Sequence, residues 1–232
     1  MPGETLGLVG ESGCGKSTTA RAVLRLVQPT SGAVQFSGYD LTRLRQRSLR
    51  RLRSKLQMIF QDPRSSINPR RKVGNVVGEG LRIWKQGSKL DREVQIRAAL
   101  AQVGLDYEVA ANKKAASFSG GQCQRISIAR ALVMKPQVLI CDEPVSSLDV
   151  SVQAQIINLL AEMKQRHGLS MLFISHDLAV VENVSDRVVV MYLGKICEVG
   201  PSSALYSDPA HPYTVSLLAA VPSTDPEERR SG

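Results

Sequence analysis

The sequence predicts an α/β fold in which buried parallel strands alternate with helices. Three observations lead to this prediction. A short apolar run at residues 5–9 passes through a glycine-rich stretch into a segment with helical spacing. Two further apolar runs, at residues 137–141 and 170–174, are typical of strands buried on both faces of a sheet. The helical pattern between these two runs ends at Gly168, so they form the crossover unit of a parallel sheet.

The rest of the chain divides around this core. Residues 187–200 consist of two apolar stretches around a Leu-Gly-Lys turn, which predicts an antiparallel hairpin at the sheet edge. The polar residues 223–232 predict a disordered tail. The predicted division is a core at residues 1–75 and 135–205, an inserted helical subdomain at residues 76–134, and a C-terminal extension at residues 206–232.

Composition limits the class of protein. The chain has 232 residues, of which 43% are hydrophobic and 22% charged, and this is enough for one globular domain with a core. The net charge of +9 favours anionic partners such as nucleotides, nucleic acid or an acidic membrane surface. Much of the excess lies in residues 41–55, whose spacing predicts a basic amphipathic helix. We interpret this helix as a solvated surface and expect no nucleic-acid partner.

The four cysteines are widely scattered, and none has the CxxC or His-rich spacing of a zinc or iron-sulfur site. This favours a reducing, cytoplasmic compartment. No segment reaches the ~20 consecutive apolar residues that a transmembrane helix needs. If the protein acts at a membrane, we expect another subunit to anchor it.

The glycine-rich stretch, GESGCGKST at residues 10–18, matches the phosphate-loop pattern GxxxxGK[ST]. Glycines let the backbone N–H groups and the following helix N-terminus point at phosphate oxygens, the lysine neutralises the terminal phosphates, and the serine hydroxyl can bind Mg²⁺. This pattern alone does not distinguish a kinase, a GTPase or an ATPase. The candidate nucleotide-binding residues are Gly10, Gly13, Gly15, Lys16, Ser17 and Thr18.

Acidic and imidazole side chains follow two of the predicted strands. In VLICDEP, Asp142 is placed to hold Mg²⁺ and Glu143 to polarise an attacking water. In FISHDL, His176 follows the next strand at the same sheet edge, within reach of a γ-phosphate. These positions favour a nucleotide-hydrolysing site over ordinary loop residues.

The segment SFSGGQCQRISIARAL resembles the signature of ATP-binding cassette (ABC) ATPases, with Ser119, Gly120, Gly121 and Gln122 opening a helix. Other elements of the family recur in order: Gln61 in MIFQDP resembles the Q-loop, SSLD, which ends at Asp149, the D-loop, and His176 the switch histidine. The resemblance covers essentially the whole chain. Phe118 replaces the commoner leucine of the signature, and because both are apolar anchors we expect no loss.

The resemblance implies a P-loop NTPase (RecA-like) core with an inserted ABC α-helical subdomain, and ATP and Mg²⁺ as cofactors. It implies that Glu143, His176 and Gln61 are catalytic and that Ser17, Gln61 and Asp142 surround the metal ion. The signature residues and Asp149 would serve the nucleotide of a second cassette, so that ATP joins two cassettes head to tail. Gln61 would relay hydrolysis to a membrane subunit.

Finer features resemble the ATPases of oligopeptide and dipeptide importers, a branch that includes nickel and glutathione uptake. The stretches QDPRSSINPR, SHDLAVVENVSDRVVVMYLGKICEVG and HPYTVSLLAAVP carry this resemblance. The last is the most discriminating because it lies outside the catalytic motifs. It implies peptide cargo, with nickel or glutathione as alternatives, and as partners transmembrane permease subunits, an identical or paralogous second ATPase and, indirectly, an extracytoplasmic solute-binding protein. The expected location is peripheral, on the cytoplasmic face of the inner membrane.

Two other classes fit less well. A soluble ABC ATPase of DNA repair or chromosome maintenance would carry a long coiled coil or a zinc insertion between phosphate loop and signature, and the sequence has neither. A non-catalytic partner subunit would be expected to lose the base or the switch residue, whereas Glu143 and His176 are both present.

Members of the family carry strands and an adenine-stacking aromatic residue before the phosphate loop, and the residues preceding Gly10 provide neither. We therefore expect an N-terminal β-subdomain that is largely missing, as in a truncated fragment, a misplaced start or the second half of a fused protein. Such a chain alone would bind ATP weakly and with little base selectivity.

Overall fold

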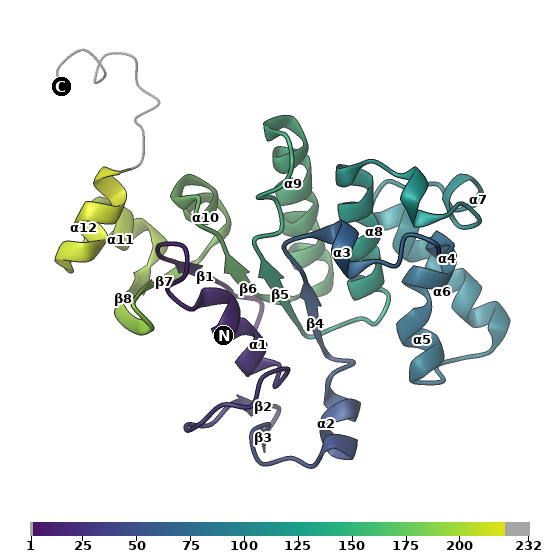
Figure 1. Ribbon diagram of the computed structural model, residues 1–232, viewed down its shortest axis with the longest axis horizontal. Helices are drawn as coiled ribbons and strands as arrows, with labels where there is room; N and C mark the ends of the chain where they lie inside the picture. Colours follow the sequence, from purple (N-terminus) through teal and green to yellow (C-terminus); the bar gives the residue numbers. More distant parts are fainter. Residues whose placement is uncertain (1, 221–232) are drawn as a thin grey trace.

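The computed structural model describes residues 2–220 and contains a six-stranded sheet flanked by helices (Figure 1). The strand order is β4-β5-β6-β1-β7-β8. Neighbouring strands are parallel except for the antiparallel β7–β8 hairpin at one edge. The strands are β1 (Thr5–Val9), β4 (Leu56–Ile59), β5 (Val138–Asp142), β6 (Ser170–Ile174), β7 (Arg187–Tyr192) and β8 (Lys195–Pro201). The predicted strands and the edge hairpin are therefore confirmed.

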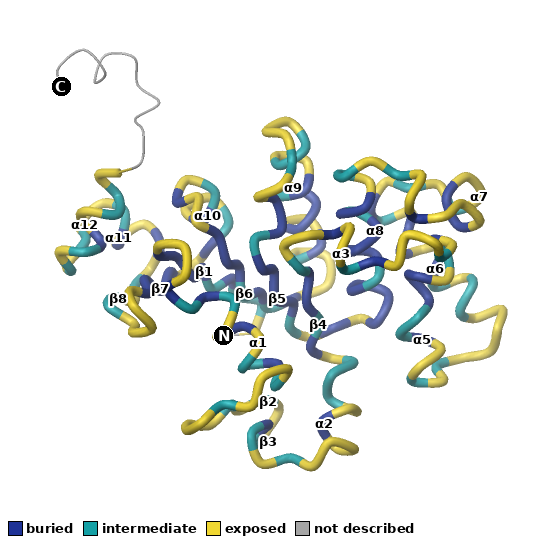
Figure 2. The backbone as a smooth tube through the Cα atoms, viewed as in Figure 1, coloured by how far each residue is buried: buried dark blue, intermediate teal, exposed yellow. Residues whose placement is uncertain are grey.

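The sheet is buried on both faces because alternate residues of its strands enter two different hydrophobic clusters. On one face, Val9, Cys141 and Phe173 pack with residues of α9 (Val150–His167) and α10 (Leu178–Val184). On the other face, Leu8 and Ile140 pack with residues of α1 (Lys16–Val23) and α2 (Gln46–Leu52). This three-layer arrangement explains why the inner strand β5 is apolar without alternation, whereas the edge strand β8 is largely exposed (Figure 2).

The crossover helix α9 ends as predicted. Gly168 caps it in the left-handed conformation, with φ of 60°, and its N–H donates to the carbonyl oxygen of Lys164. A residue without a Cβ adopts this conformation most easily, so the glycine stops the helix before β6 begins.

A helical subdomain lies at the β4 end of the sheet (Figure 1). At its centre is α8 (Gly120–Leu132), which packs against α3 (Pro63–Ser66), α4 (Val73–Val77) and α6 (Lys89–Gln102). Ile126 and Ala129 are completely buried, so one apolar face of this helix packs inside the subdomain. The other elements of this region are α5 (Glu79–Ile83), α7 (Tyr107–Ala110) and the 3₁₀ helix η1 (Ala115–Ser117).

The basic helix predicted at residues 41–55 is shorter in the structure. Only α2, seven residues long, is helical. Before it, Leu41 donates its N–H to the carbonyl oxygen of Val34, next to the small hairpin of β2 (Gln35–Phe36) and β3 (Tyr39–Asp40). Arg45 then has an extended backbone and caps the helix. Leu41 pairs with the residue before the hairpin at one end, and β4 begins at Leu56 at the other. Only a short helix fits between them.

Two short helices complete the described chain, α11 (Ser202–Ser207) and α12 (Pro212–Ala219), beside β8 (Figure 1). The predicted disordered tail at residues 223–232 lies outside the described residues. Within residues 2–220, no helix combines the length and the apolar character needed to cross a bilayer.

Candidate functional site

The phosphate loop connects the central strand β1 to α1, as predicted. Gly10, Gly13 and Gly15 have φ values of +148°, +81° and +107°, which L side chains rarely adopt. A Cβ on Gly10 would also lie 2.1 Å from the carbonyl oxygen of Met191. The glycines therefore let the loop pass close to β7 and turn into the start of α1, where backbone N–H groups of the helix N-terminus can face an anion.

Lys16 is held over this loop. Its side chain is almost entirely buried, and Nζ donates to the carbonyl oxygens of Gly10 at 2.7 Å and Glu11 at 2.8 Å. Within the described part of the chain, no carboxylate forms a salt bridge with Lys16. Its positive charge is thus available to a bound anion.

Ser17, which follows Lys16, contacts another candidate metal ligand, Asp142. Ser17 Oγ donates to Asp142 Oδ1 at 2.7 Å, and the Asp142 residue is 2% exposed. A hydroxyl and a carboxylate oxygen are the ligand types that Mg²⁺ prefers. The pair joins the start of α1 to the end of β5, so two distant segments create one hard-oxygen site.

Two further candidate residues, Gln61 and His176, contact the carboxylate of a third, Glu143. Gln61 Nε2 donates to Glu143 Oε2 at 2.8 Å, and His176 Nδ1 lies 3.4 Å from Glu143 Oε1. Glu143 itself has φ of 46°, an unusual conformation for a residue with a Cβ. Its N–H donates to the carbonyl oxygen of Ile174, which anchors this turn to β6. Backbone strain held in this way is common at functional sites.

Most of these residues line one cavity with a volume of about 510 Å³. Asp142 does not line the cavity itself but is hydrogen-bonded to Ser17, which does. Gly10 lies on the side of the loop that packs against Met191. Sequence reasoning did not include Ser12, although it lies inside the same motif. The lining residues are Ser12, Gly13, Gly15, Lys16, Ser17, Thr18, Gln61, Glu143 and His176.

The signature residues lie elsewhere. Ser119 caps α8, and its hydroxyl accepts the N–H of Gln122 while Gln122 Oε1 accepts the N–H of Ser119. Ser119, Gly120, Gly121 and Asp149 line a second cavity, of 400 Å³, that shares no lining residue with the first. The structure therefore does not bring the signature to the chain's own phosphate loop.

One link between these regions was not predicted. Gln124, fully buried in α8, donates from Nε2 to the carbonyl oxygen of Pro144 at 2.7 Å. Because Pro144 directly follows Glu143, this bond fixes the signature helix against the segment that carries the candidate base. A polar residue inside an apolar helix pattern was the only signal for it in the sequence.

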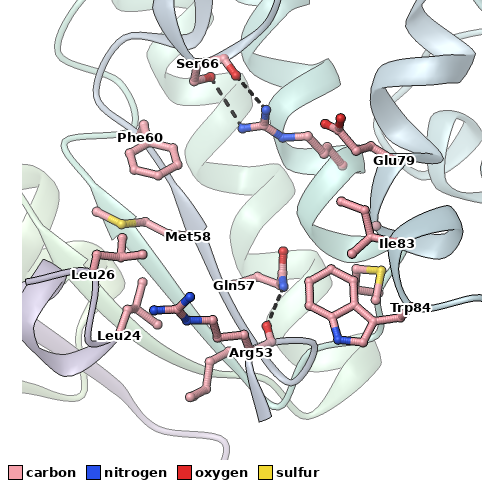
Figure 3. A pocket seen from close by; sticks show the side chains of 14 residues that line it. Leu24, Leu26, Arg53, Gln57, Met58, Phe60, Ser66, Glu79, Ile83 and Trp84 are labelled. Atoms are coloured by element: carbon pink, nitrogen blue, oxygen red, sulfur yellow. Dashed lines mark hydrogen bonds between the residues drawn. The ribbon is translucent and has the colours of Figure 1, made fainter. Parts of the chain in front are cut away.

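A third hollow, of 300 Å³, lies between the core and the helical subdomain (Figure 3). Met58 and Phe60 lie on one side of it, together with Leu26, and face Ile83 and Trp84 on the other side. Phe60 directly precedes Gln61. Trp84 Nε1 donates to the carbonyl oxygen of Arg50 at 3.0 Å. This apolar groove draws on residues from 24 to 134, which is why sequence reasoning missed it.

The comparison with protein families gives two matches. The ABC transporter family matches residues 1–146. The oligopeptide/dipeptide transporter C-terminal region matches residues 197–232.

Relatives of the chain agree with these matches. It is 54% identical over 227 residues to a putative peptide import ATP-binding protein of Brucella ovis, covering 98% of this chain and 71% of that protein. It is 51% identical over 230 residues to the oligopeptide transport ATP-binding protein OppF of Salmonella typhimurium, covering 99% of this chain and 69% of that protein.

Solved structures show the same fold. CbiO1 of Clostridium perfringens, part of the ABC transporter complex CbiONQ, matches with a TM-score of 0.79 and 28% identity over 89% of this chain and 80% of that chain. The ATP-binding cassette MJ0796, solved as a post-hydrolysis dimer with ADP and Pi, matches with a TM-score of 0.78 and 28% identity over 87% of each chain. With this fold and a phosphate loop, paired carboxylates and signature helix in place, the chain belongs to the ABC transporter ATPases, in the oligopeptide and dipeptide import branch.

Proposed function

We propose that this chain binds Mg-ATP in the 510 Å³ cavity and hydrolyses it to drive the import of oligopeptides or dipeptides through a membrane permease. The single observation that supports this most strongly is the pair of contacts from Gln61 and His176 to Glu143, at the edge of the phosphate-loop cavity. The relatives named for peptide import favour peptides over nickel or glutathione as cargo.

Ser17, Asp142 and Gln61 would hold the Mg²⁺ ion, and the hydrogen bond between Ser17 and Asp142 supports this set of ligands. The bound ion would neutralise charge on the β- and γ-phosphates. Lys16 would bind the same phosphates from the side of the loop, because its Nζ is already held there by two carbonyl oxygens.

Glu143 would polarise the attacking water. Its side chain is 15% exposed, so it can reach a water in the cavity while Gln61 and His176 hold its two oxygens. His176, with a side chain 58% exposed, would then lie beside the γ-phosphate.

The complete site would form between two cassettes. Ser119 and the N–H groups that follow it open toward a cavity separate from the phosphate loop, which supports a role with the nucleotide of a second subunit. Asp149 lines the same cavity and would also act across the interface. The dimeric state of MJ0796 is consistent with this arrangement.

The apolar groove in Figure 3 would receive a segment of the permease. Its wall includes Phe60, the neighbour of Gln61, so a change at the nucleotide site would be passed to the groove through adjacent residues. The chain would then work as a peripheral subunit on the cytoplasmic side of the membrane, and a solute-binding protein would contact it only through the permease.

Reconstitution tests this function. The chain would be combined with the permease subunits of a peptide importer in proteoliposomes that contain peptide-loaded binding protein. We expect ATP hydrolysis that rises when peptide, but not nickel or glutathione, is supplied. Stimulation by nickel or glutathione alone would contradict the proposed cargo, and absence of any ATP hydrolysis would contradict the proposed site.

A further inference from the structure

The C-terminal helix α12 contacts the nucleotide-binding loop directly. Tyr213, in its first turn, accepts at its hydroxyl oxygen a hydrogen bond from the N–H of Glu11, with a donor–acceptor distance of 3.2 Å. Glu11 is the second residue of the phosphate loop, and Tyr213 lies 202 positions further along the chain. This contact joins the region matched to oligopeptide/dipeptide transporters to the loop shared by nucleotide-binding proteins.

Several contacts fix Tyr213 in place. Its ring packs against that of Tyr192 on β7, with centroids 4.3 Å apart. Glu198 on β8 accepts the N–H groups of Ala210 at 2.9 Å and His211 at 3.1 Å, and so holds the start of α12. His211 Nδ1 in turn accepts the N–H of Tyr213 at 3.1 Å. The tyrosine hydroxyl is therefore presented by an anchored helix start and not by a free side chain.

Glu11, whose N–H contacts Tyr213, also binds Lys16 through its carbonyl group. The carbonyl oxygen of Glu11 accepts Lys16 Nζ at 2.8 Å. It also accepts the N–H of Cys14, at 3.3 Å, which closes the turn of the loop. Glu11 is thus held at its N–H by the C-terminal helix and, at its carbonyl, holds the lysine that would meet the phosphates.

We propose that Tyr213 is a positioning residue for ATP binding, which it promotes by fixing Glu11 and through it Lys16. The C-terminal region that matches oligopeptide/dipeptide transporters would then act on the nucleotide site of its own chain, because Tyr213 sets the geometry of the phosphate loop. The inference rests on the proposed ATP site. It assigns Tyr213 no contact with the nucleotide and no part in the chemical step.

Replacement of Tyr213 by phenylalanine tests the hydroxyl alone, since the ring contact with Tyr192 is kept. Affinity for a non-hydrolysable ATP analogue with Mg²⁺ would be measured by calorimetry on the whole chain. One lost hydrogen bond predicts an affinity about three- to tenfold weaker. Steady-state hydrolysis should show KM for ATP raised by a similar factor with kcat nearly unchanged. The melting temperature should stay close to that of the wild type, since a general loss of structure would lower it.

Tyr192→Phe is the matched control. It removes a hydroxyl from the same ring pair, and within residues 2–220 that hydroxyl has no hydrogen-bond partner. We expect wild-type affinity for this variant. Equal weakening in both variants would assign the effect to the ring pair and overturn the inference, as would wild-type affinity in Tyr213→Phe.

A double-mutant cycle tests the route through Lys16. If Tyr213 acts by positioning Lys16, adding Tyr213→Phe to Lys16→Ala should cause little further loss of affinity. Fully additive losses would contradict the inference. Binding of the analogue by the wild-type chain distinguishes failure of the proposed ATP site from failure of the inference. If the wild type does not bind the analogue, both are contradicted. If the wild type and Tyr213→Phe bind it with equal affinity, only the inference is contradicted.

Discussion

Lys16 combines near-complete burial with two hydrogen bonds to carbonyl oxygens of the phosphate loop. In Lys16→Ala we expect ATP to bind about ten- to a hundredfold more weakly, because a charge-assisted hydrogen bond contributes roughly 1.5–3 kcal/mol. Calorimetry with the non-hydrolysable analogue measures this loss. Lys113→Ala, which removes an exposed lysine of the helical region, should bind like the wild type. Unchanged affinity in Lys16→Ala would remove this lysine from the site.

His176 should act on turnover and not on binding. Its imidazole lies 3.4 Å from Glu143 Oε1, and more than half of the side chain is exposed toward the cavity. In His176→Ala, we expect hydrolysis to fall on the order of a hundredfold, as on removal of one transition-state contact, while ATP affinity changes little. A kinetic assay paired with equilibrium binding separates these effects. A large loss of affinity with unchanged kcat would contradict the assignment.

At the residue scale, functional residues that are close together in the sequence could be predicted, whereas contacts between residues far apart in the sequence could not. Gly10, Lys16 and Ser17 belong to one motif, so their spacing alone predicts the loop. Glu143 could be recognised because it follows an apolar strand in a chain that already holds a phosphate loop. The hydrogen bond from Glu11 to Tyr213 joins positions that only the folded sheet brings together, and no local pattern encodes it.

At the scale of elements, apolar patterns predicted β1, β5, β6 and α9 nearly to the residue. They were less reliable for α2, where helical spacing continued over residues that instead pair with a hairpin and lead into β4. Tertiary pairing outweighs helix propensity there, because propensities contribute only up to about 0.7 kcal/mol per ordinary residue. The cavity between core and helical subdomain was also unpredictable, since it depends on how these elements meet.

The signature helix α8 gives a test at the same scale. Ser119 is exposed at its N-cap and lines the cavity with Asp149. In Ser119→Arg we expect the monomer to bind ATP normally but not to dimerise, because a bulky cation would fill the surface that we propose meets the partner's nucleotide. Ser203→Arg, at an exposed position of α11, should dimerise like the wild type.

Light scattering and ATP binding by each of these variants measure the two properties separately. Loss of ATP binding by the Ser119→Arg monomer would contradict a role in trans. Normal ATP-dependent dimerisation would show that the signature surface is not part of the interface.

The sheet topology explains the whole site. Because β1 lies between β6 and β7 and is parallel to both, the phosphate loop that follows β1 lies at the same sheet edge as the ends of β5 and β6. Asp142 is the last residue of β5, Glu143 follows it, and His176 follows the end of β6. Ligand binding at the carboxyl ends of parallel strands is a general property of open α/β sheets, and it made this convergence predictable from strand order. The signature lines a cavity of its own, and under the proposed arrangement each chain would contribute half of two nucleotide sites.

Substitution of Glu143 by glutamine tests the central claim, that two of these chains enclose ATP and that Glu143 promotes its hydrolysis. The amide keeps the size of the side chain and spares Lys16, Ser17 and the signature residues, but it cannot act as a base. Size-exclusion chromatography with Mg-ATP, together with phosphate release, measures both parts of the claim. We predict a stable ATP-bound dimer with no turnover. Hydrolysis at the wild-type rate, or an ATP-bound protein that stays monomeric, would contradict the account.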